Sequence, residues 1–301
     1  MTSYVVELAG VTKRFGEQVA VDRLDLQVPE GSIHGFIGPN GSGKTTTLRV
    51  ILRIHQPDAG CVRVLGKDRS EAANDQLGYL PEERGLYKRM TVRQVLRYFA
   101  QLKGVRRPDP QISWWLDRMG AREFEHKRVE QLSKGMAQKV QFIAAVAAQP
   151  RLVILDEPFS GLDPVSQSAM RDVVLELRQT GTTVIFSTHD MEVAQGLCDR
   201  VLMIHRGRKV LDGPLDSIRQ QYGSNLLRVR MDGGAALPAD LRGIAECVAT
   251  GGFFDLRLAD HSCRPELLQQ LAARGNLEHF EVVRPSLRDI FVRIAGTEQT
   301  T

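Results

Sequence analysis

A glycine-rich run followed by lysine and threonine is the strongest chemical signal in the sequence. Residues 38–45 read Gly-Pro-Asn-Gly-Ser-Gly-Lys-Thr, between an apolar run at 33–37 and a helical pattern at 46–54. Glycines let successive backbone N–H groups face one anion, and the following helix adds the positive end of its dipole. Lys44 would reach the outer phosphates of a nucleotide, and the Thr45 hydroxyl would bind Mg²⁺. The pattern predicts a phosphate-binding loop, and the alternative is a chance glycine turn. The residues expected to bind the nucleotide here are Gly38, Pro39, Asn40, Gly41, Ser42, Gly43, Lys44, Thr45 and Thr46.

A second run of residues ends in two acids, Asp156 and Glu157. Residues 152–155 are all apolar β-formers, which predicts a buried parallel strand whose carboxyl end opens on a ligand. Asp156 would hold the Mg²⁺ shell, and Glu157 would polarise the attacking water. An Asp-Glu pair after a strand is also an ordinary way to start a loop. The phosphate-binding loop upstream favours the chemical interpretation.

Further stretches resemble the ATP-binding cassette (ABC) proteins. Residues 132–136, Leu-Ser-Lys-Gly-Met, are similar to the signature motif, residues 160–163 to the D-loop, and residues 187–190 to the switch-histidine segment. The runs at 78–87 and 285–291, with the Leu-Ser-Lys-Gly form of the signature, resemble the exporter branch that includes sodium-export and multidrug or antibiotic-resistance systems. The resemblance implies an α/β P-loop NTPase fold: an ABC ATPase domain with a parallel-sheet core, an antiparallel β subdomain and a helical subdomain.

The signature region also has a physical logic of its own. Ser133 precedes a helical stretch at 138–148, so its hydroxyl, the Gly135 backbone and the helix N-terminus form a second anion-binding end. In the family, two domains pair head to tail, and each ATP lies between the phosphate loop of one and the signature of the other. The resemblance thus implies a two-fold dimer with a second copy of the chain. Two positions depart from the family pattern: Lys134 replaces the commoner Gly, and Met136 replaces Gln and cannot supply an amide.

Four more site residues follow from the resemblance. Glu82 occupies the position of the family's Q-loop glutamine, and its carboxylate suits Mg²⁺ and its water shell. Phe15 matches the aromatic residue that stacks on adenine, although a core or turn role is the alternative. His189 follows an apolar strand, which favours a γ-phosphate contact at the same edge as Glu157. Asp163 belongs to the D-loop and can also cap the helix that starts at the following proline.

The pattern along the chain predicts two domains. Residues 1–220 form the nucleotide-binding domain, with a helical subdomain at about 88–148, and residues 221–301 form a small α+β accessory domain. Trp114 and Trp115 lie in the helical subdomain, where packing is roughly three times likelier than a partner-facing role. The accessory domain carries no catalytic motif. Its expected strands are 226–231, 253–258 and 279–283, and its expected helices are 265–273 and 286–295.

Composition restricts the possible classes. The 301 residues are 42% hydrophobic and 25% charged, enough for one large and one small core. Net charge is 40 − 36, or +4, with no dense basic run, so no nucleic acid is expected as a partner. No apolar stretch approaches ~20 residues and no charged-then-apolar leader opens the chain, so we expect neither a membrane span nor secretion. Four cysteines without metal spacing favour a reducing cytoplasm.

The sequence predicts an ATPase subunit that binds Mg-ATP, dimerises on it and drives a separate integral membrane permease, as part of an exporter. It would lie at the cytoplasmic face of the membrane, held there by the permease. The competing class is a soluble ABC protein acting on ribosomes or DNA, which usually carries two cassettes or a long coiled coil. A P-loop kinase or GTPase is disfavoured because no Asn-Lys-x-Asp guanine motif appears and Glu157 supplies a hydrolytic base.

Overall fold

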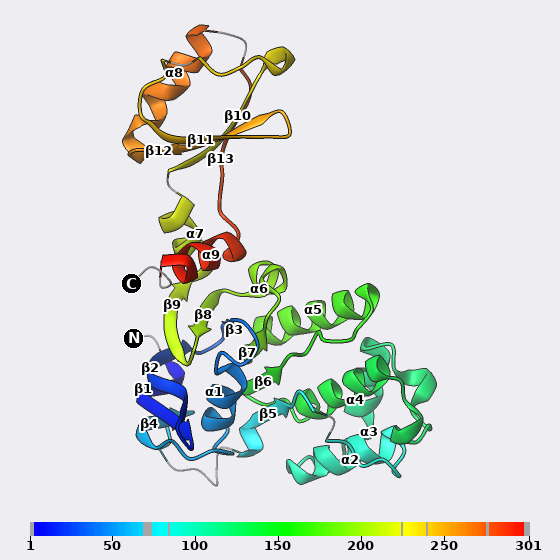
Figure 1. Ribbon diagram of the computed structural model, residues 1–301. Helices are drawn as coiled ribbons and strands as arrows, with labels where there is room; N and C mark the ends of the chain where they lie inside the picture. Colours follow the sequence, from blue (N-terminus) through cyan, green and yellow to red (C-terminus); the bar gives the residue numbers. More distant parts are fainter. Residues whose placement is uncertain are drawn as a thin grey trace. The chain divides into compact units, whose positions relative to one another are not determined.

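The chain divides into two compact units, Met1–Gly213 and Pro214–Thr301, drawn in Figure 1. The computed structural model describes residues 3–68, 74–83, 85–223, 225–238, 240–274 and 277–297, so Arg84 of the 78–87 run lies outside the described residues. The boundary expected after residue 220 falls within helix α7 (Leu215–Gly223). This helix belongs to the second unit, since Arg219 Nε donates a hydrogen bond to the Pro285 carbonyl at 3.3 Å.

A six-stranded, largely parallel sheet forms the centre of the first unit. Its order is β5-β6-β7-β3-β8-β9, and its strands are Leu77–Leu80 (β5), Leu152–Asp156 (β6), Thr183–Thr188 (β7), Ile33–Ile37 (β3), Arg200–His205 (β8) and Arg208–Pro214 (β9). Every residue of β3, β6 and β7 is buried, as expected for parallel strands covered on both faces. The carboxyl ends of β3, β5, β6 and β7 therefore share one edge, which is where the predicted site residues begin.

A second, antiparallel sheet packs beside this core. It has the order β2-β1-β4, from Gln18–Pro29 (β2), Tyr4–Phe15 (β1) and Ala59–Val64 (β4). Strands β1 and β2 are each 12 residues long, with register shifts along their pairing. Buried Val6 and Leu26 from this sheet pack in one cluster with Phe36 of β3 and Leu48, which joins the two sheets.

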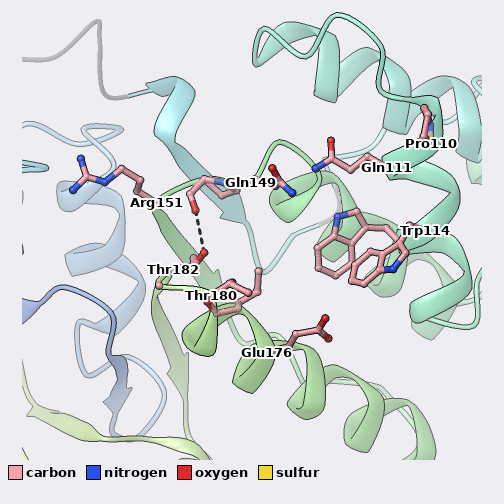
Figure 2. A pocket seen from close by; sticks show the side chains of 12 residues that line it. Pro110, Gln111, Trp114, Gln149, Arg151, Glu176, Thr180 and Thr182 are labelled. Carbon is pink, nitrogen blue, oxygen red and sulfur yellow. Dashed lines mark hydrogen bonds between the residues drawn. The ribbon is translucent and has the colours of Figure 1, made fainter.

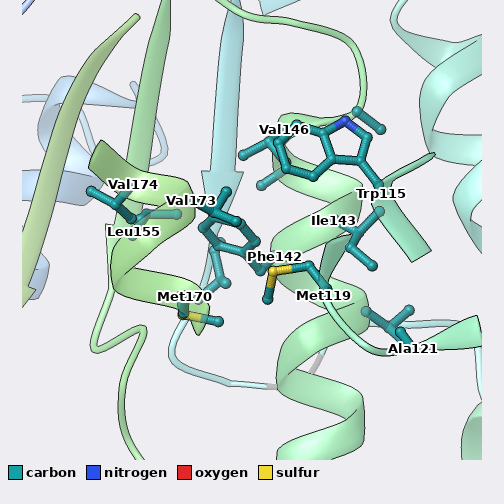
Figure 3. Packing of buried hydrophobic residues seen from close by; sticks show 14 of the residues in the cluster. Trp115, Met119, Ala121, Phe142, Ile143, Val146, Leu155, Met170, Val173 and Val174 are labelled. Atoms are coloured by element: carbon teal, nitrogen blue, oxygen red, sulfur yellow. The ribbon is translucent and has the colours of Figure 1, made fainter. Parts of the chain in front are cut away.

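In the described part of the first unit there are also six α-helices: Lys44–Ile51 (α1), Val92–Leu102 (α2), Asp109–Arg118 (α3), Lys134–Val146 (α4), Pro164–Gln179 (α5) and Met191–Leu197 (α6). Figure 3 shows how α4 joins the helical subdomain to the central sheet. Phe142 of α4 is fully buried in a cluster with Leu155 of β6, Val173 of α5 and Met119 at the end of α3. Short 3₁₀ turns lie at Asn74–Gln76, Arg122–Phe124 and Val129–Gln131. No helix among the described residues is long and apolar enough to span a bilayer.

The second unit is a four-stranded antiparallel sheet with helices. Its order is β11-β12-β10-β13, and its elements are α7, Leu226–Met231 (β10), Ile244–Thr250 (β11), Phe253–Leu258 (β12), Arg264–Arg274 (α8), Leu277–Val282 (β13) and Leu287–Thr297 (α9), with 3₁₀ turns at Asp232–Gly234 and His261–Cys263. Leu267 and Leu271 of α8 are buried with Leu227, Val229 and Leu256 of the sheet. Strand β11 was not predicted, because nearly all of its residues are exposed and show no apolar alternation.

Candidate nucleotide-binding site

The loop between β3 and α1 folds around the side chain of Lys44. The Lys44 ammonium donates hydrogen bonds to the carbonyls of Gly38 at 2.8 Å and Pro39 at 3.1 Å, and the residue is almost wholly buried. Burial lowers the pKa of Lys44, while the nearby carboxylates of Glu157, Asp156 and Glu82 act in the opposite direction. The sequence thus places a buried cation inside a loop of backbone groups, where an anionic phosphate can replace its present carbonyl partners.

Two glycines make this tight loop possible. Gly38 has φ 151°, and a methyl group built on it would lie 2.2 Å from the Ile204 carbonyl oxygen. Gly43 has φ 110°, and the same construction places the methyl 2.4 Å from the Ala20 carbonyl oxygen. Both positions combine a backbone conformation that L side chains avoid with a steric clash. Substitution of either glycine would displace the loop from the strand it follows.

Asp156, the last residue of β6, has one hydrogen-bonded carboxylate oxygen and one without a partner in the described part of the chain. Oδ1 of Asp156 accepts hydrogen bonds from Thr45 Oγ1 at 3.1 Å and Ser187 Oγ at 2.5 Å. Oδ2 of Asp156 is buried and has no hydrogen-bond partner among the described residues. An unpaired buried carboxylate oxygen is costly unless a cation or water binds it. This donor set, with the Thr45 hydroxyl beside it, fits Mg²⁺, which prefers oxygen ligands and keeps several waters.

Glu157 is held at the same edge by contacts from β7 and from the residue that follows it. Its backbone N–H donates to Ser187 Oγ of β7 at 3.0 Å, and its Oε1 lies 3.1 Å from His189 Nδ1. Its backbone is left-handed, with φ 49°, and the side chain is only 11% exposed. Gln138 of α4 anchors the next residue by donating to the Pro158 carbonyl at 3.0 Å. Burial raises the pKa of Glu157, an effect that the His189 contact opposes.

Lys44, Thr45 and Glu157 line a cavity of about 500 Å³, whereas Asp156 and His189 are not among its lining residues. Its walls are Phe15, Gln18, Ala20, Asn40, Gly41, Gly43, Lys44, Thr45, Thr46, Glu82 and Glu157. The Phe15 ring is 47% exposed and meets His55 edge-on, with 5.2 Å between the ring centroids. An exposed aromatic ring near the mouth and a cation with carboxylates at the base suit a planar base carrying phosphates. The structure therefore brings Phe15, residues of the loop, Glu82 and Glu157 together around one cavity.

The other predicted residues lie apart from this cavity. Ser133 caps α4, with its hydroxyl accepting the Met136 N–H at 3.3 Å, and Gly135 lies in the first turn of the same helix. Asp163 caps α5 by accepting the Ser166 N–H at 2.9 Å and the Ser166 hydroxyl at 2.6 Å. Hydrogen bonds from Ser166 hold the pKa of Asp163 below its ordinary value. None of Ser133, Gly135 and Asp163 lines the cavity that holds Lys44.

Sequence reasoning missed Ser187 and Gln138 as site residues. Ser187 is the next-to-last residue of β7. Its hydroxyl donates a hydrogen bond to Asp156 and accepts one from the Glu157 backbone N–H. Gln138 is buried on α4 and donates a hydrogen bond to the carbonyl of Pro158, 20 residues later in the chain. A hydroxyl just before a strand end was the one available signal for Ser187. Nothing local distinguishes Gln138 from an ordinary helix residue.

Comparison with known sequences identifies the family. The family described as ABC transporter matches residues 21–160, and the family described as the C-terminal domain of DrrA1-3-like ATP-binding proteins matches residues 213–295. The uncharacterized ABC transporter ATP-binding protein YhaQ of Bacillus subtilis (strain 168) is 39% identical over 288 residues, covering 95% of this chain and 97% of the relative. The chain belongs to the ATP-binding subunits of ABC transporters. It is an ABC ATPase, and its family and fold class confirm the sequence predictions.

More distant relatives of this ABC subunit carry names from export. The Nod factor export ATP-binding protein I of Rhizobium sp. (strain N33) is 33% identical, over 99% of both chains. The daunorubicin resistance ATP-binding protein DrrA3 of Streptomyces coeruleorubidus is 31% identical, over 99% of this chain and 98% of the relative. Among solved structures, an ATP-binding subunit of an ABC transporter aligns with a TM-score of 0.69 and 29% identity, over 73% of this chain and 93% of that one.

A larger cavity in this ABC subunit lies away from the nucleotide-binding edge. It has a volume of about 610 Å³ and lies between α3 and the C-terminal end of α5 (Figure 2). Arg151 and Thr182, which precede β6 and β7, line it, so it opens at the amino ends of these strands. The indole rings of Trp114 and Trp115 meet edge-on there, with 4.7 Å between their centroids. No residue of the predicted ATP site lines this cavity.

Proposed function

We propose that this subunit binds Mg-ATP, closes on it as a dimer of two identical chains, and uses hydrolysis to drive a separate membrane permease of an exporter. The observation that supports this most directly is the division of the site. The cavity holds Lys44, Thr45 and Glu157, whereas Ser133 and Gly135 lie elsewhere on the chain. A second copy must bring its signature to the first copy's cavity to complete the site.

Binding rests on the loop and the metal ligands. The Lys44 ammonium and the loop N–H groups bind the β- and γ-phosphates of ATP, and Phe15 stacks on the adenine. Thr45, Asp156 and Glu82 would hold Mg²⁺ and its water shell, and the buried, unpaired Oδ2 of Asp156 would be the main ligand. Mg²⁺ supplies charge neutralisation for the transferring phosphoryl group.

Hydrolysis uses the Glu157 and His189 pair as its catalytic residues. Glu157 accepts a proton from the attacking water, for which its carboxylate must be ionised. His189 binds the Glu157 carboxylate at 3.1 Å and contacts the γ-phosphate from the end of the neighbouring strand. Ser187 fixes the Glu157 backbone, so the base is held in position before the nucleotide arrives.

The signature and D-loop complete the site across the dimer. Ser133, Gly135 and Asp163 of one chain would contact the ATP bound in the phosphate loop of the other, in a two-fold interface. A related cassette has been solved as a dimer bound to ADP and phosphate, with a TM-score of 0.64 and 24% identity over 70% of this chain and 98% of that one. That likeness supports the fold, and the separation of the two motifs supports the dimer.

An exposed aromatic patch favours a membrane permease as the second partner. Tyr87, Tyr98 and Leu102 are exposed on the segment after Glu82 and on α2, and the Tyr87 and Tyr98 rings lie 5.3 Å apart. Exposed apolar side chains that lie close together after the cavity-lining residue Glu82 are suited to a protein interface. The export names of the relatives favour an exporter, which would hold this subunit at the cytoplasmic face of the membrane. The net charge of +4 gives little support for a ribosome- or DNA-acting ABC protein.

Mixed dimers test the shared site. A chain with Lys44→Ala paired with a chain with Ser133→Arg places both lesions in one site and leaves the other site intact. Single-turnover hydrolysis should therefore return in the mixture, although neither homodimer hydrolyses ATP. Full single-turnover activity from the Ser133→Arg homodimer would refute the shared site. Co-purification of the neighbouring membrane protein, and its loss on Tyr98→Asp, tests the permease separately.

A further inference from the structure

Lys134 of the signature lies across the D-loop of its own chain. A methyl group built on Gly161 would lie 2.7 Å from Lys134 Cε, 2.8 Å from Cδ and 3.0 Å from Nζ. Gly161 itself has φ 73°, a conformation that favours glycine. Because Gly161 has no side chain, the Lys134 side chain fits into the space beside it. The side chain of Lys134 therefore lies against the D-loop, although the residue as a whole is exposed.

The charge of Lys134 has no evident structural purpose. In the described part of the chain its ammonium has neither a hydrogen bond nor an ion pair, and the first turn of α4 contains no acidic residue. A cation at the N-terminal end of a helix opposes the helix dipole. Lys139, farther along α4, differs because it adds to the hydrogen bonds from Ser166 in stabilising the Asp163 carboxylate. Water solvates the ammonium of this exposed residue in the free chain, and an anion that reached this end of the helix would pair with it.

We propose that Lys134 is a nucleotide-contacting residue, which offers its ammonium to the terminal phosphate of the ATP held by the second copy's phosphate loop. The proposal rests on the shared site described above. Ser133 and Gly135 flank Lys134, so the partner's nucleotide arrives at this turn of the helix. An ammonium is a compact point charge well suited to phosphate, and charge on the γ-phosphoryl oxygens is what hydrolysis must stabilise. The contact with Gly161 keeps the Lys134 side chain beside the signature before ATP binds.

The test separates the effect of the Lys134 charge from that of its side-chain shape, in a hydrolysis-deficient Glu157→Gln background. Lys134→Met keeps an unbranched side chain of similar reach over Gly161, with sulfur and a methyl group at the δ and ε positions, but removes the charge. Lys139→Met is the matched control on the same helix. The readout is the ATP concentration that gives half-maximal dimerisation, measured by analytical ultracentrifugation. Lys134→Met should require about five- to tenfold more ATP and lose part of the salt dependence, because one charge-assisted contact is missing. Lys134→Arg should restore dimerisation, and Lys139→Met should behave as the background.

The outcomes separate this role from the shared site itself. If the Glu157→Gln chain dimerises with ATP but Lys134→Met dimerises at the same ATP concentration, the role of Lys134 is wrong and the shared site stands. If the Glu157→Gln chain stays monomeric at saturating ATP, the shared site and the role of Lys134 both fail. An equal loss in Lys139→Met would also overturn the proposal, because it would show a general effect of charge on α4. Thermal unfolding of each variant, unchanged from the background, establishes that the comparison is between folded proteins.

Discussion

Nδ1 of His189 lies 3.1 Å from Oε1 of Glu157, although the two residues are 32 positions apart in the chain. The contact follows from the register of two neighbouring parallel strands, in which Asp156 of β6 pairs with Ser187 of β7. The two strands therefore end at the same edge of the sheet, where Glu157 and His189, which follow them, come into contact. The general base and its histidine are brought together by sheet topology and by no local feature of either segment.

Glu157→Gln should bind ATP and hydrolyse it about 10² to 10⁴ times more slowly, because the amide cannot accept the proton of the attacking water. Calorimetric ATP titration and single-turnover hydrolysis measure the two effects. Lys44→Ala is the contrasting variant and should weaken ATP binding itself. Near-normal turnover in Glu157→Gln with the permease present would show that another group is the base.

Loss of the histidine should change the pH profile of hydrolysis. Burial raises the pKa of Glu157, and the His189 contact opposes that rise. His189→Ala removes the opposing contact, so the pKa of Glu157 should rise further. The base is then ionised only at higher pH, and the acid limb of the single-turnover rate should shift to higher pH. A rate that falls by the same factor at every pH would show that His189 acts without affecting the ionisation of Glu157.

Much of this site could be predicted because its residues follow strand ends. The loop at Lys44, the Asp156 and Glu157 pair and His189 each come directly after an apolar run, and parallel strands align such positions at one edge. Ser187 and Gln138 could not be predicted in their roles, because their hydrogen bonds join segments whose contact only the folded core determines. The same limit applies to strand β11, whose exposed residues lack the alternation that a buried face imposes.

The two adjacent tryptophans should differ sharply in their contribution to stability. Trp115 is 5% exposed and packs in the core of the helical subdomain, as Figure 3 shows, whereas Trp114 is 48% exposed. Trp115→Ala should cost about 3–5 kcal/mol of unfolding free energy, since it leaves a large cavity. Trp114→Ala should cost less than about 1 kcal/mol, so each variant is the control for the other. Urea unfolding measures both, and equal losses would contradict this assignment of the core.

The buried histidine of β3 should make the first unit sensitive to acid. His34 is fully buried, and neither ring nitrogen has a hydrogen-bond partner among the described residues. Burial, with a smaller contribution from the charge of Arg200, lowers the pKa of His34 to about 3. The native ring therefore stays neutral at pH values where the unfolded ring is already protonated. The free energy of unfolding that depends on this ring is fully present above the ordinary pKa of 6.5 and is lost as pH falls toward about 3.

His34→Leu should remove that pH dependence while filling the same buried space with an apolar side chain. The variant should gain about 2 kcal/mol over the unmodified chain at about pH 5, beyond any difference at neutral pH. Urea unfolding of both proteins over this pH range measures the gain. His126→Gln is the control for an exposed histidine. That side chain is 82% exposed and lies 3.1 Å from the Glu125 carboxylate, a surface contact whose loss should change the pH dependence much less than His34→Leu does. Parallel stability profiles for His34→Leu and the unmodified chain would mean that acid unfolding begins at another group, since a neutral buried ring must otherwise lose stability when its unfolded form binds a proton.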